Sequence, residues 1–338
     1  YTNVASLVMF IFFIQLVYNL PVDTFGLPAI TASIHAGEVS SFLGFAPATV
    51  KAAAFAALFL GFAVKVPVVP FHTWLPDAHV EAPTPVSVLL AGVLLKMGTY
   101  AMLRYNFTMM PEVAQQYAVP IALFAVVSVI YGALLALGQR DLKRIVAYSS
   151  VSSMGYVILG LVAYTTLGVG GATFQMVAHG LISGLMFMSV GVLYNETHTR
   201  MVGKMSGLAD RMPITVGILV AGAFGYMGLP LMAGFAAEFF IFQGSFASTV
   251  LPSAPLFTAT AMFGIVIVAG YLLWAMQRTL FGPYELETDY DVSSAGLSDT
   301  VPLAVLLLSI VVLGVAPELF FGMITDAITP ILEAGGGA

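Results

Sequence analysis

The chain contains no cysteine among its 338 residues. This absence excludes disulfide bonds, thiolate-bound iron–sulfur clusters, haem–thiolate ligation and cysteine-based zinc sites. Charged residues are also scarce, because Asp, Glu, Lys and Arg make up 8% of the chain, against about 25% in soluble domains. The composition therefore argues against a soluble protein, and we expect no metal site and no nucleic-acid partner.

Hydrophobic residues make up 59% of the chain, and the mean hydropathy is +0.98. Apolar stretches recur along its whole length, each long enough to cross ~30 Å of hydrocarbon as a helix. We therefore predict an all-α polytopic membrane protein. Its nine expected spans lie near residues 4–20, 47–66, 85–105, 117–138, 145–166, 170–195, 213–248, 255–281 and 301–334.

Two of these expected spans are not simple crossings, and the start of the chain is also informative. The seventh expected span is too long for one straight helix, so we predict a break near Pro230, and the last is expected to bend at Pro317. The first residue is Tyr1, and no positively charged segment precedes the first span. We interpret this as an internal start rather than a signal peptide.

Basic residues in the connecting segments orient the expected bundle. One side carries only Lys51 and Arg104, and the other carries Arg140, Lys143, Arg144, Arg200, Lys204, Arg211 and Arg278. Positive residues favour the cytoplasmic side of a membrane. We therefore expect a multi-pass protein of the cell membrane, with the connecting segment 71–84 in the cytoplasm and the C-terminus outside.

Four ionisable side chains fall inside or at the end of apolar spans: Lys65, Lys96, His179 and Glu238. Each costs about 2.5–3.5 kcal/mol to insert, so together they cost roughly 10 kcal/mol. Ordinary explanations exist: Lys65 could extend to the headgroups, His179 could make a structural hydrogen bond, and Glu238 could pair with a base. Lys96 is the hardest to explain in this way, because about ten apolar or small residues flank it on each side.

A set of buried groups without redox ligands indicates a path for protons. Histidine titrates near neutral pH, and burial brings lysine and carboxyl groups towards the same range. The expected helix breaks support this interpretation, because unwound backbone in a membrane must line a cavity or be buried in protein. Two interrupted spans, each with a buried charge, are typical of inverted-repeat transport folds. The residues that break them are Pro67 and Pro70 in one, and Gly228, Pro230 and Gly234 in the other.

A second polar group occupies the expected cytoplasmic side. It comprises His72, Asp77, His79 and Glu81, with Asp141, Lys143 and Arg144 on a later connection. Ordinary polarity at the membrane surface would explain these residues. The alternative hypothesis is a site of proton entry and coupling next to Lys65.

Three stretches resemble a known family. "FAVKVPVVPFHTWLPDAHVEAPTPVSVLLAGVLLKMGTYAMLR", "GQRDLKRIVAYSSVSSMGYVILG" and "FQMVAHGLISGLMF" are similar to the antiporter-like membrane subunits of respiratory complex I, especially the subunit called M, chain 4 or D. The resemblance implies fourteen spans, two inverted five-helix repeats and a proton channel. Here it implies one antiporter-like domain over 1–338, with the end of the first repeat at 1–105, the second repeat at 117–281 and a C-terminal helix at 301–338.

The resemblance also implies roles for single residues. Lys65 matches the lysine on the first broken helix, Lys96 the connecting lysine, and His179 the histidine of the central polar axis. Glu238 matches the charged residue on the second broken helix, towards the outer exit. The family's first five spans have no counterpart in this chain, nor has the glutamate that pairs with the lysine matched by Lys65. That half of the channel lies on a partner chain, lies outside this fragment, or is defective.

The resemblance implies a proton-translocating subunit of a complex I-type quinone oxidoreductase. Other membrane-arm and redox-arm subunits, including neighbouring antiporter-like subunits, would be its partners in the bilayer. Flavin, iron–sulfur clusters and quinone are expected in those subunits, and no cofactor in this chain. A subunit of a sodium (cation)/proton antiporter is the near alternative. A haem-bearing enzyme would need two facing histidines inside the membrane, and a structural scaffold would need no relay at all.

Overall fold

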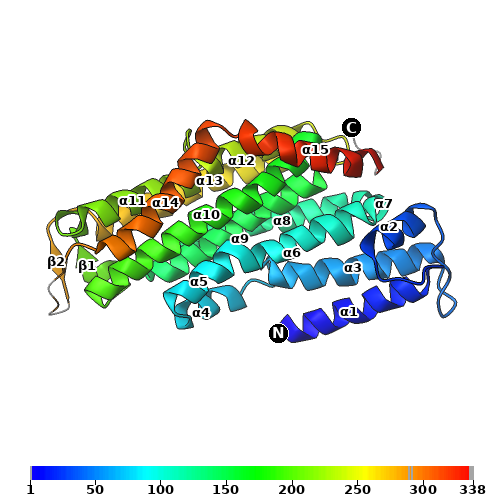
Figure 1. Ribbon diagram of the computed structural model, residues 1–338, viewed down its shortest axis with the longest axis horizontal. Helices are drawn as coiled ribbons and strands as arrows, with labels where there is room; N and C mark the ends of the chain where they lie inside the picture. The colour runs from blue at the N-terminus through cyan, green and yellow to red at the C-terminus, as the bar shows by residue number, and fades with distance from the viewer. Residues whose placement is uncertain (1, 288–289, 291, 335–338) are drawn as a thin grey trace.

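The computed structural model describes residues 2–287, 290 and 292–334, which form a long helical bundle (Figure 1). The α-helices are α1 (Thr2–Tyr18), α2 (Leu27–His35), α3 (Pro47–Lys65), α4 (Trp74–Glu81), α5 (Thr84–Leu89), α6 (Leu95–Ala101), α7 (Pro111–Gln116), α8 (Ala118–Leu137), α9 (Leu142–Val162), α10 (Thr166–Thr197), α11 (Pro213–Tyr226), α12 (Ala233–Phe246), α13 (Ala254–Thr279), α14 (Leu297–Val315) and α15 (Glu318–Ala334). Two π-helical segments, η1 (Leu90–Leu94) and η2 (Met102–Thr108), interrupt the third span.

The smallest elements lie at one end of the bundle. They are the 3₁₀ turns η3 (Val202–Lys204) and η4 (Leu208–Asp210), and the strands β1 (Met205–Ser206) and β2 (Glu285–Leu286). The strands pair antiparallel, with Met205 opposite Leu286. This pairing ties the connection after α10 to the connection after α13, so it braces the polar end of the bundle.

The all-α membrane architecture predicted from the sequence is confirmed. Within the described residues, seven helices are long and apolar enough to cross a membrane, counting α5 to η2 as one of 25 residues. The helices α1 and α11 are apolar but shorter. The long helix α9 is almost entirely buried, because α8, α10, α4 and α12 all pack against it, and α8, α9 and α10 run side by side through the middle of the bundle (Figure 1).

Both predicted helix breaks are present. The helix α3 ends at Lys65 and the chain becomes helical again at Trp74; α11 ends at Tyr226 and α12 begins at Ala233. The bend at Pro317 separates α14 from α15 as expected. The connecting segment 71–84 contains a short helix that the sequence analysis did not predict, α4, which packs against α9.

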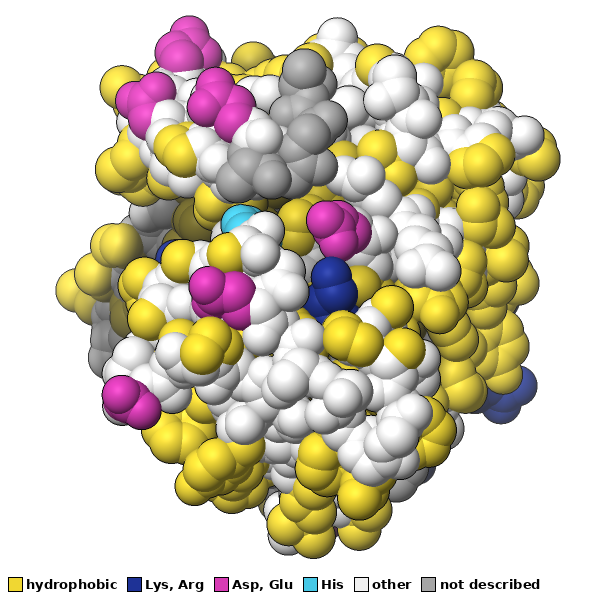
Figure 2. Space-filling model, turned by 90° about the vertical axis from the view of Figure 1, so that its right-hand side faces the viewer, with side chains coloured by type: hydrophobic (Ala, Val, Ile, Leu, Met, Phe, Trp, Pro, Cys, Tyr) yellow, Lys and Arg dark blue, Asp and Glu magenta, His cyan; other side chains and the backbone are white. Residues whose placement is uncertain are grey.

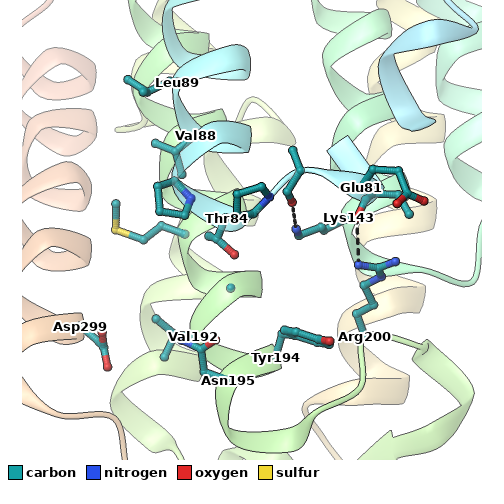
Figure 3. A pocket seen from close by; sticks show the side chains of 16 residues that line it. Glu81, Thr84, Val88, Leu89, Lys143, Val192, Tyr194, Asn195, Arg200 and Asp299 are labelled. Atoms are coloured by element: carbon teal, nitrogen blue, oxygen red, sulfur yellow. Dashed lines mark hydrogen bonds between the residues drawn. The ribbon is translucent and has the colours of Figure 1, made fainter. Parts of the chain in front are cut away.

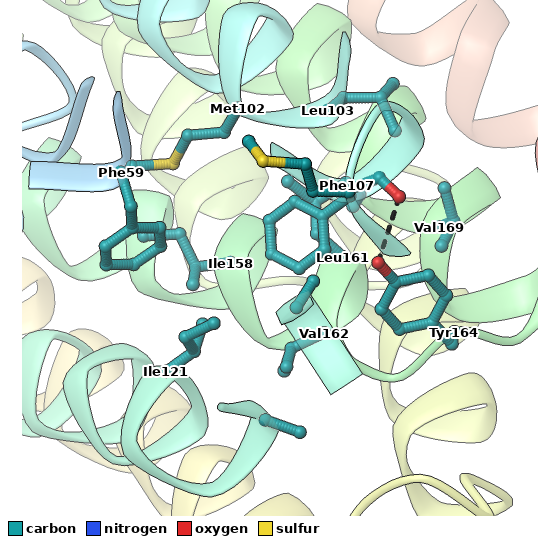
Figure 4. Packing of buried hydrophobic residues seen from close by; sticks show 14 of the residues in the cluster. Phe59, Met102, Leu103, Phe107, Ile121, Ile158, Leu161, Val162, Tyr164 and Val169 are labelled. Carbon is teal, nitrogen blue, oxygen red and sulfur yellow. Dashed lines mark hydrogen bonds between the residues drawn. The ribbon is translucent and has the colours of Figure 1, made fainter. Parts of the chain in front are cut away.

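An apolar cluster fills the bundle near the end that carries α7. Its side chains come from α3, η2, α8, α9 and α10, and the Tyr164 hydroxyl donates to the Phe107 carbonyl at 2.9 Å (Figure 4). Phe107 and Ile158 are almost completely buried there. A close-packed interior of this kind leaves few voids larger than a water molecule, so it seals this part of the bundle against water.

The two ends of the bundle differ in charge. The end seen in Figure 2 carries α2 and α7, and acidic side chains are spread over it among hydrophobic and uncharged atoms. Lys51 pairs with Glu112 at 3.2 Å there. The opposite end holds the strands, the connection that contains Arg200 and Lys204, and the last turn of α13 with Arg278. The prediction that this end faces the cytoplasm depends on these bases.

Close packing of α8 on α9 depends on glycine, which gives the first prediction. A Cβ atom at Gly155 would lie 2.6 Å from the Ala125 carbonyl oxygen, which is backbone and cannot rotate away. We expect Gly155→Val to lower the free energy of unfolding by roughly 1–3 kcal/mol through overpacking. Thermal unfolding of the purified protein in detergent measures this change.

The matched control is Gly270→Ala on α13, where a new Cβ would meet nothing within 4 Å. Alanine favours a helix over glycine by about 1 kcal/mol, so this variant is expected to be as stable as the parent or more so. Equal melting temperatures for the two variants would contradict close packing between α8 and α9.

Candidate functional site

The centre of the candidate site is a contact between Lys96 on α6 and His179 on α10. The Lys96 Nζ lies 2.7 Å from the His179 Nδ1, and it also donates to the Ala91 carbonyl at 2.5 Å. His179 is almost completely buried. Two titratable side chains from different spans therefore share a hydrogen bond inside the bundle.

The local backbone explains this contact. The π-helical turn of η1 has i→i+5 spacing, so the carbonyl of Ala91 faces Lys96, five residues later; such turns are frequent at functional sites. The helix α10 approaches η1 through two glycines, since a Cβ at Gly180 would lie 2.9 Å from the Gly92 carbonyl oxygen. A larger residue at Gly180 would force the two helices, and with them Lys96 and His179, apart.

Lys65 ends α3 beside the first break and is half-buried. Its Nζ lies 5.8 Å from the centre of the Trp74 ring, and the Trp74 indole donates to the Val64 carbonyl at 2.8 Å. A Cβ at Gly98 on α6 would lie 3.4 Å from the Lys65 Cβ. Lys65 therefore packs against α6 two residues from Lys96, and within the described chain it forms no ion pair.

Glu238 lies on α12, just past the second break, and is 5% exposed. Its Oε2 lies against Gly228, where a Cβ would approach it to 2.6 Å. Gly228 has φ +64°, a left-handed conformation that glycine adopts without cost. The Oε2 atom has no hydrogen-bond partner among the described residues, and the structure shows no direct contact between Glu238 and His179.

The other residues of the two predicted breaks lie where the chain turns. Pro67 and Pro70 fall between α3 and α4, and Pro230 falls between α11 and α12. Gly234 is in the first turn of α12, where it packs against the Gly225 carbonyl at the end of α11. The two halves of the second broken helix, α11 and α12, therefore pack directly against each other at Gly225 and Gly234.

On the end predicted to be cytoplasmic, Asp141 organises a group of hydrogen bonds. Its carboxylate caps α9 by accepting from the backbone amides of Lys143 and Arg144, at 2.8 and 3.3 Å. It also pairs with Arg200 at 2.5 Å. The side chains of Lys143 and Arg200 then donate to the carbonyls of Ala82 and Val80, which ties α4 and α5 to α9 and to the end of α10.

The remaining members of the predicted cytoplasmic group separate into two kinds. His72 and His79 are buried, and His79 stacks on Phe187 with 4.2 Å between ring centres. Burial, together with the charges of Lys143 and Lys96, lowers the pKa of His79 to about 3, and burial also lowers the pKa of His72. Both rings are therefore neutral at physiological pH. Asp77 and Glu81 are exposed, and Asp77 pairs with Arg144 at 3.0 Å.

A pocket of about 760 Å³ opens at this end between α5, α10 and α14 (Figure 3). Lys143 and Arg200 line one side of it, and Asp299 lies across from them (Figure 3). Val88 and Leu89 line the part that reaches towards η1. The pocket therefore opens beside the start of the third span, the same span that carries Lys96.

Two residues of this site were missed by sequence reasoning. Arg200 counted only as a loop base, although its pairing with Asp141 is central. Tyr226 contacts His179 from the end of α11, and tyrosine within an apolar span carries no charge that would mark it. Its position directly before the second break, in "GYMGLP", is the signal that could have identified it. Within the described residues, no cluster of three or more His, Asp or Glu has a geometry fit for a metal ion.

The Asp141 group gives a prediction about stability. We expect Asp141→Ala to lower the free energy of unfolding by about 2 kcal/mol, because it removes a helix cap worth about 1 kcal/mol and leaves the partly buried Arg200 without its partner. Asp77→Ala is the matched control, since the Asp77–Arg144 pair is exposed and such pairs contribute at most about 1 kcal/mol. Thermal unfolding in detergent compares them, and a larger loss in the control would contradict this assignment.

Comparison with known proteins supports a family assignment. The family model "NADH:quinone oxidoreductase/Mrp antiporter, TM" matches residues 1–267. F(420)H(2) dehydrogenase subunit M of Methanosarcina mazei is 40% identical over 339 aligned positions, covering 100% of this chain and 66% of that protein. NADH-quinone oxidoreductase subunit M of Rickettsia bellii is 37% identical over 292 positions, covering 86% and 58%. The chain thus spans less than two thirds of the length of these relatives.

Comparison with solved structures supports the same family assignment. A chain of respiratory complex I from Thermus thermophilus matches with a TM-score of 0.84 and 27% identity, covering 98% of this chain and 68% of that one. A chain of the Mrp complex from Dietzia sp. DQ12-45-1b matches with a TM-score of 0.83 and 19% identity, covering 99% and 68%, which shows a shared fold. The chain belongs to the NADH:quinone oxidoreductase/Mrp antiporter family of transmembrane proteins.

Proposed function

We propose that this chain carries a proton pathway across the cell membrane as a membrane-arm subunit of a complex I-type quinone oxidoreductase. The observation that carries the proposal is the 2.7 Å contact between Lys96 and His179, enclosed between two broken helices. A lysine and a histidine in contact can exchange a proton, and they occupy a position that hydrocarbon alone would make costly.

The pathway uses the four buried groups in the order in which the helices place them. Lys65 packs against α6 beside Lys96, Lys96 contacts His179, and Glu238 lies at the second break on the other side of α10. A proton on Lys96 passes to the Nδ1 of His179 and then leaves towards Glu238. The predicted division into repeats, 1–105 and 117–281, puts one broken helix in each half.

Access to the pathway follows from the packing. The pocket beside Lys143 and Arg200 provides an entrance for water at the predicted cytoplasmic end. At the other end the apolar cluster around Phe107 and Tyr164 closes the direct way out along α6 and η2. The proton is therefore directed sideways through His179 to the second break. The neutral His79 ring and the buried His72 ring line the cytoplasmic side of this route without adding charge.

The redox chemistry belongs to other subunits of this proposed assembly. The chain has no cysteine for an iron–sulfur cluster, and flavin, clusters and quinone are assigned to partner subunits. Neighbouring antiporter-like subunits and a redox arm would supply the energy for proton transport. The excess of bases at the end with the strands favours a cytoplasmic placement of that end, with the C-terminus outside.

A cation/proton antiporter subunit is the second candidate, because the Mrp chain has the same fold. The names of the relatives at 37–40% identity, both oxidoreductase subunits, favour the first candidate. Proton transport by membrane vesicles, followed with a pH-sensitive dye, separates the two. Transport driven by electron transfer and independent of sodium supports the oxidoreductase assembly, whereas transport driven by a sodium gradient supports the antiporter.

Removing the central lysine tests the pathway. We expect Lys96→Met to lower proton translocation through this subunit by about tenfold or more, because a positioned proton-transfer group contributes about 10²–10⁴-fold. The measurement is the number of protons moved per electron pair by the assembled complex in vesicles. Glu238→Gln, which keeps the shape of the side chain, is expected to give the same loss.

The matched control is Lys51→Met, which removes a lysine at the outer end whose partner Glu112 is exposed. It is expected to leave the proton yield within about twofold of the parent, since exposed pairs contribute little. An assembled Lys96→Met complex with an unchanged proton yield would rule out this pathway.

A further inference from the structure

We propose that Tyr226 is the group that receives the proton from His179, and that its hydroxyl switches partner with the tautomer of His179. This inference rests on the proposed function and adds a residue to its pathway. It follows from two hydrogen bonds that meet at one imidazole ring and from a third that Tyr226 shares with Ser150. The ring has two nitrogens, and each faces a different proton-carrying side chain.

The geometry around Tyr226 is specific. Tyr226 is the last residue of α11 and is 6% exposed. Its hydroxyl oxygen lies 3.4 Å from the His179 Nε2 and 3.3 Å from the Ser150 Oγ on α9. The two rings meet edge to face, with 5.6 Å between centres. The hydroxyl therefore stands between α10 and α9, with His179, Ser150 and Ser183 as possible partners.

The hydrogen bonds of Ser150 limit what Tyr226 can do. The Ser150 hydroxyl donates its own hydrogen to the Val146 carbonyl at 3.2 Å. In that arrangement Ser150 accepts from Tyr226. A tyrosine hydroxyl has one hydrogen to donate, so Tyr226 donates either to a serine, Ser150 or Ser183, or to His179, and not to both.

The tautomer of His179 decides between these two partners. When Lys96 is an ammonium group it donates to Nδ1, so a neutral ring carries its hydrogen on Nε2 and donates to the Tyr226 oxygen. Tyr226 then donates to Ser150. When Lys96 is a neutral amine, the ring can carry its hydrogen on Nδ1 and donate to Lys96. Nε2 then accepts from Tyr226, and the bond from Tyr226 to Ser150 is lost.

Proton transfer converts the first arrangement into the second. An N–H bond of the Lys96 ammonium breaks and an Nδ1–H bond forms. The Tyr226 hydroxyl turns its hydrogen from Ser150 towards water at the second break. The Nε2–H bond of His179 then breaks as that proton passes to the Tyr226 oxygen, and the O–H bond to the turned hydrogen breaks as that proton passes to the water. One positive charge moves from Lys96 to that water, and no group is oxidised or reduced. The hydrogen that Tyr226 received from His179 still points at Nε2, so Tyr226 now donates to His179 as in the second arrangement.

The position of Tyr226 gives this transfer a direction. Gly228 follows two residues later, and the Glu238 carboxylate lies against it. Tyr226 and Glu238 thus flank the same helix break, while no hydrogen bond among the described residues joins Glu238 to His179 directly. Unwound backbone at this depth lines a cavity or is enclosed by protein, so the break is where water can take the proton from Tyr226 to Glu238.

The test is Tyr226→Phe in the assembled complex in membrane vesicles. This change removes one hydroxyl and keeps the ring, so the packing of α11 on α10 is retained. We expect the proton yield per electron pair through this subunit to fall by about tenfold, at the low side for a proton-transfer group because water can enter the vacated space. The control is Tyr156→Phe, since the buried Tyr156 hydroxyl donates to the Ala261 carbonyl at 3.3 Å and does not touch His179.

A spectroscopic measurement distinguishes a role of Tyr226 in proton transfer from a purely structural role. Infrared difference spectra of the complex labelled with ¹⁵N-histidine, taken with and without electron donor, report the tautomer of the buried imidazole. In the parent and in Tyr156→Phe we expect a change of tautomer during turnover. In Tyr226→Phe we expect no such change, although the complex assembles.

The outcomes distinguish this inference from the proposed function. Loss of proton yield in both His179→Phe and Tyr226→Phe, with Tyr156→Phe unaffected, supports it. Loss in His179→Phe with a normal yield and tautomer change in Tyr226→Phe overturns the role of Tyr226 and leaves the pathway standing. A normal yield in both variants overturns the pathway itself, and the role of Tyr226 with it.

Discussion

Hydrocarbon offers no hydrogen-bond partner, and this constraint determines how the two broken helices are built. Each break leaves backbone groups and a charged side chain at a depth where lipid cannot satisfy them. The bundle therefore encloses the breaks with other helices, and α9 is buried almost along its whole length as a result. Its polar residues, including Ser149 and Ser150, face protein instead of lipid.

Glycine makes this enclosure possible. Gly155 lets α9 approach α8, the pair Gly92 and Gly180 lets α10 approach the third span, and Gly234 joins the two halves of the second break. Helix association in membranes depends on close packing more than on the hydrophobic effect, and small residues permit it. The contact between Lys96 and His179 is therefore set by backbone geometry, and the side chains only have to extend across a short gap.

Much of this arrangement could be predicted from the sequence. Apolar runs located the spans to within a few residues, and the prolines near 67 and 230 located both breaks. The helix α4 was missed because Pro76 and three polar residues make its short sequence resemble a loop. The Lys96–His179 contact could not be foreseen, because 83 residues separate the two and the π-helical turn that aims Lys96 has no sequence signature. Tyr226 was missed because a hydroxyl in a span carries no charge.

The helix α10 has a mechanical consequence. It runs without interruption over 32 residues, about 48 Å at 1.5 Å per residue. His179 lies near its middle. Arg200 follows three residues after its end, where it pairs with Asp141 and donates a hydrogen bond to the backbone of α4. Because α10 is continuous, we expect a movement of Arg200 to move His179 along the face of the third span. A force applied at Arg200 would therefore reach the interior of the bundle.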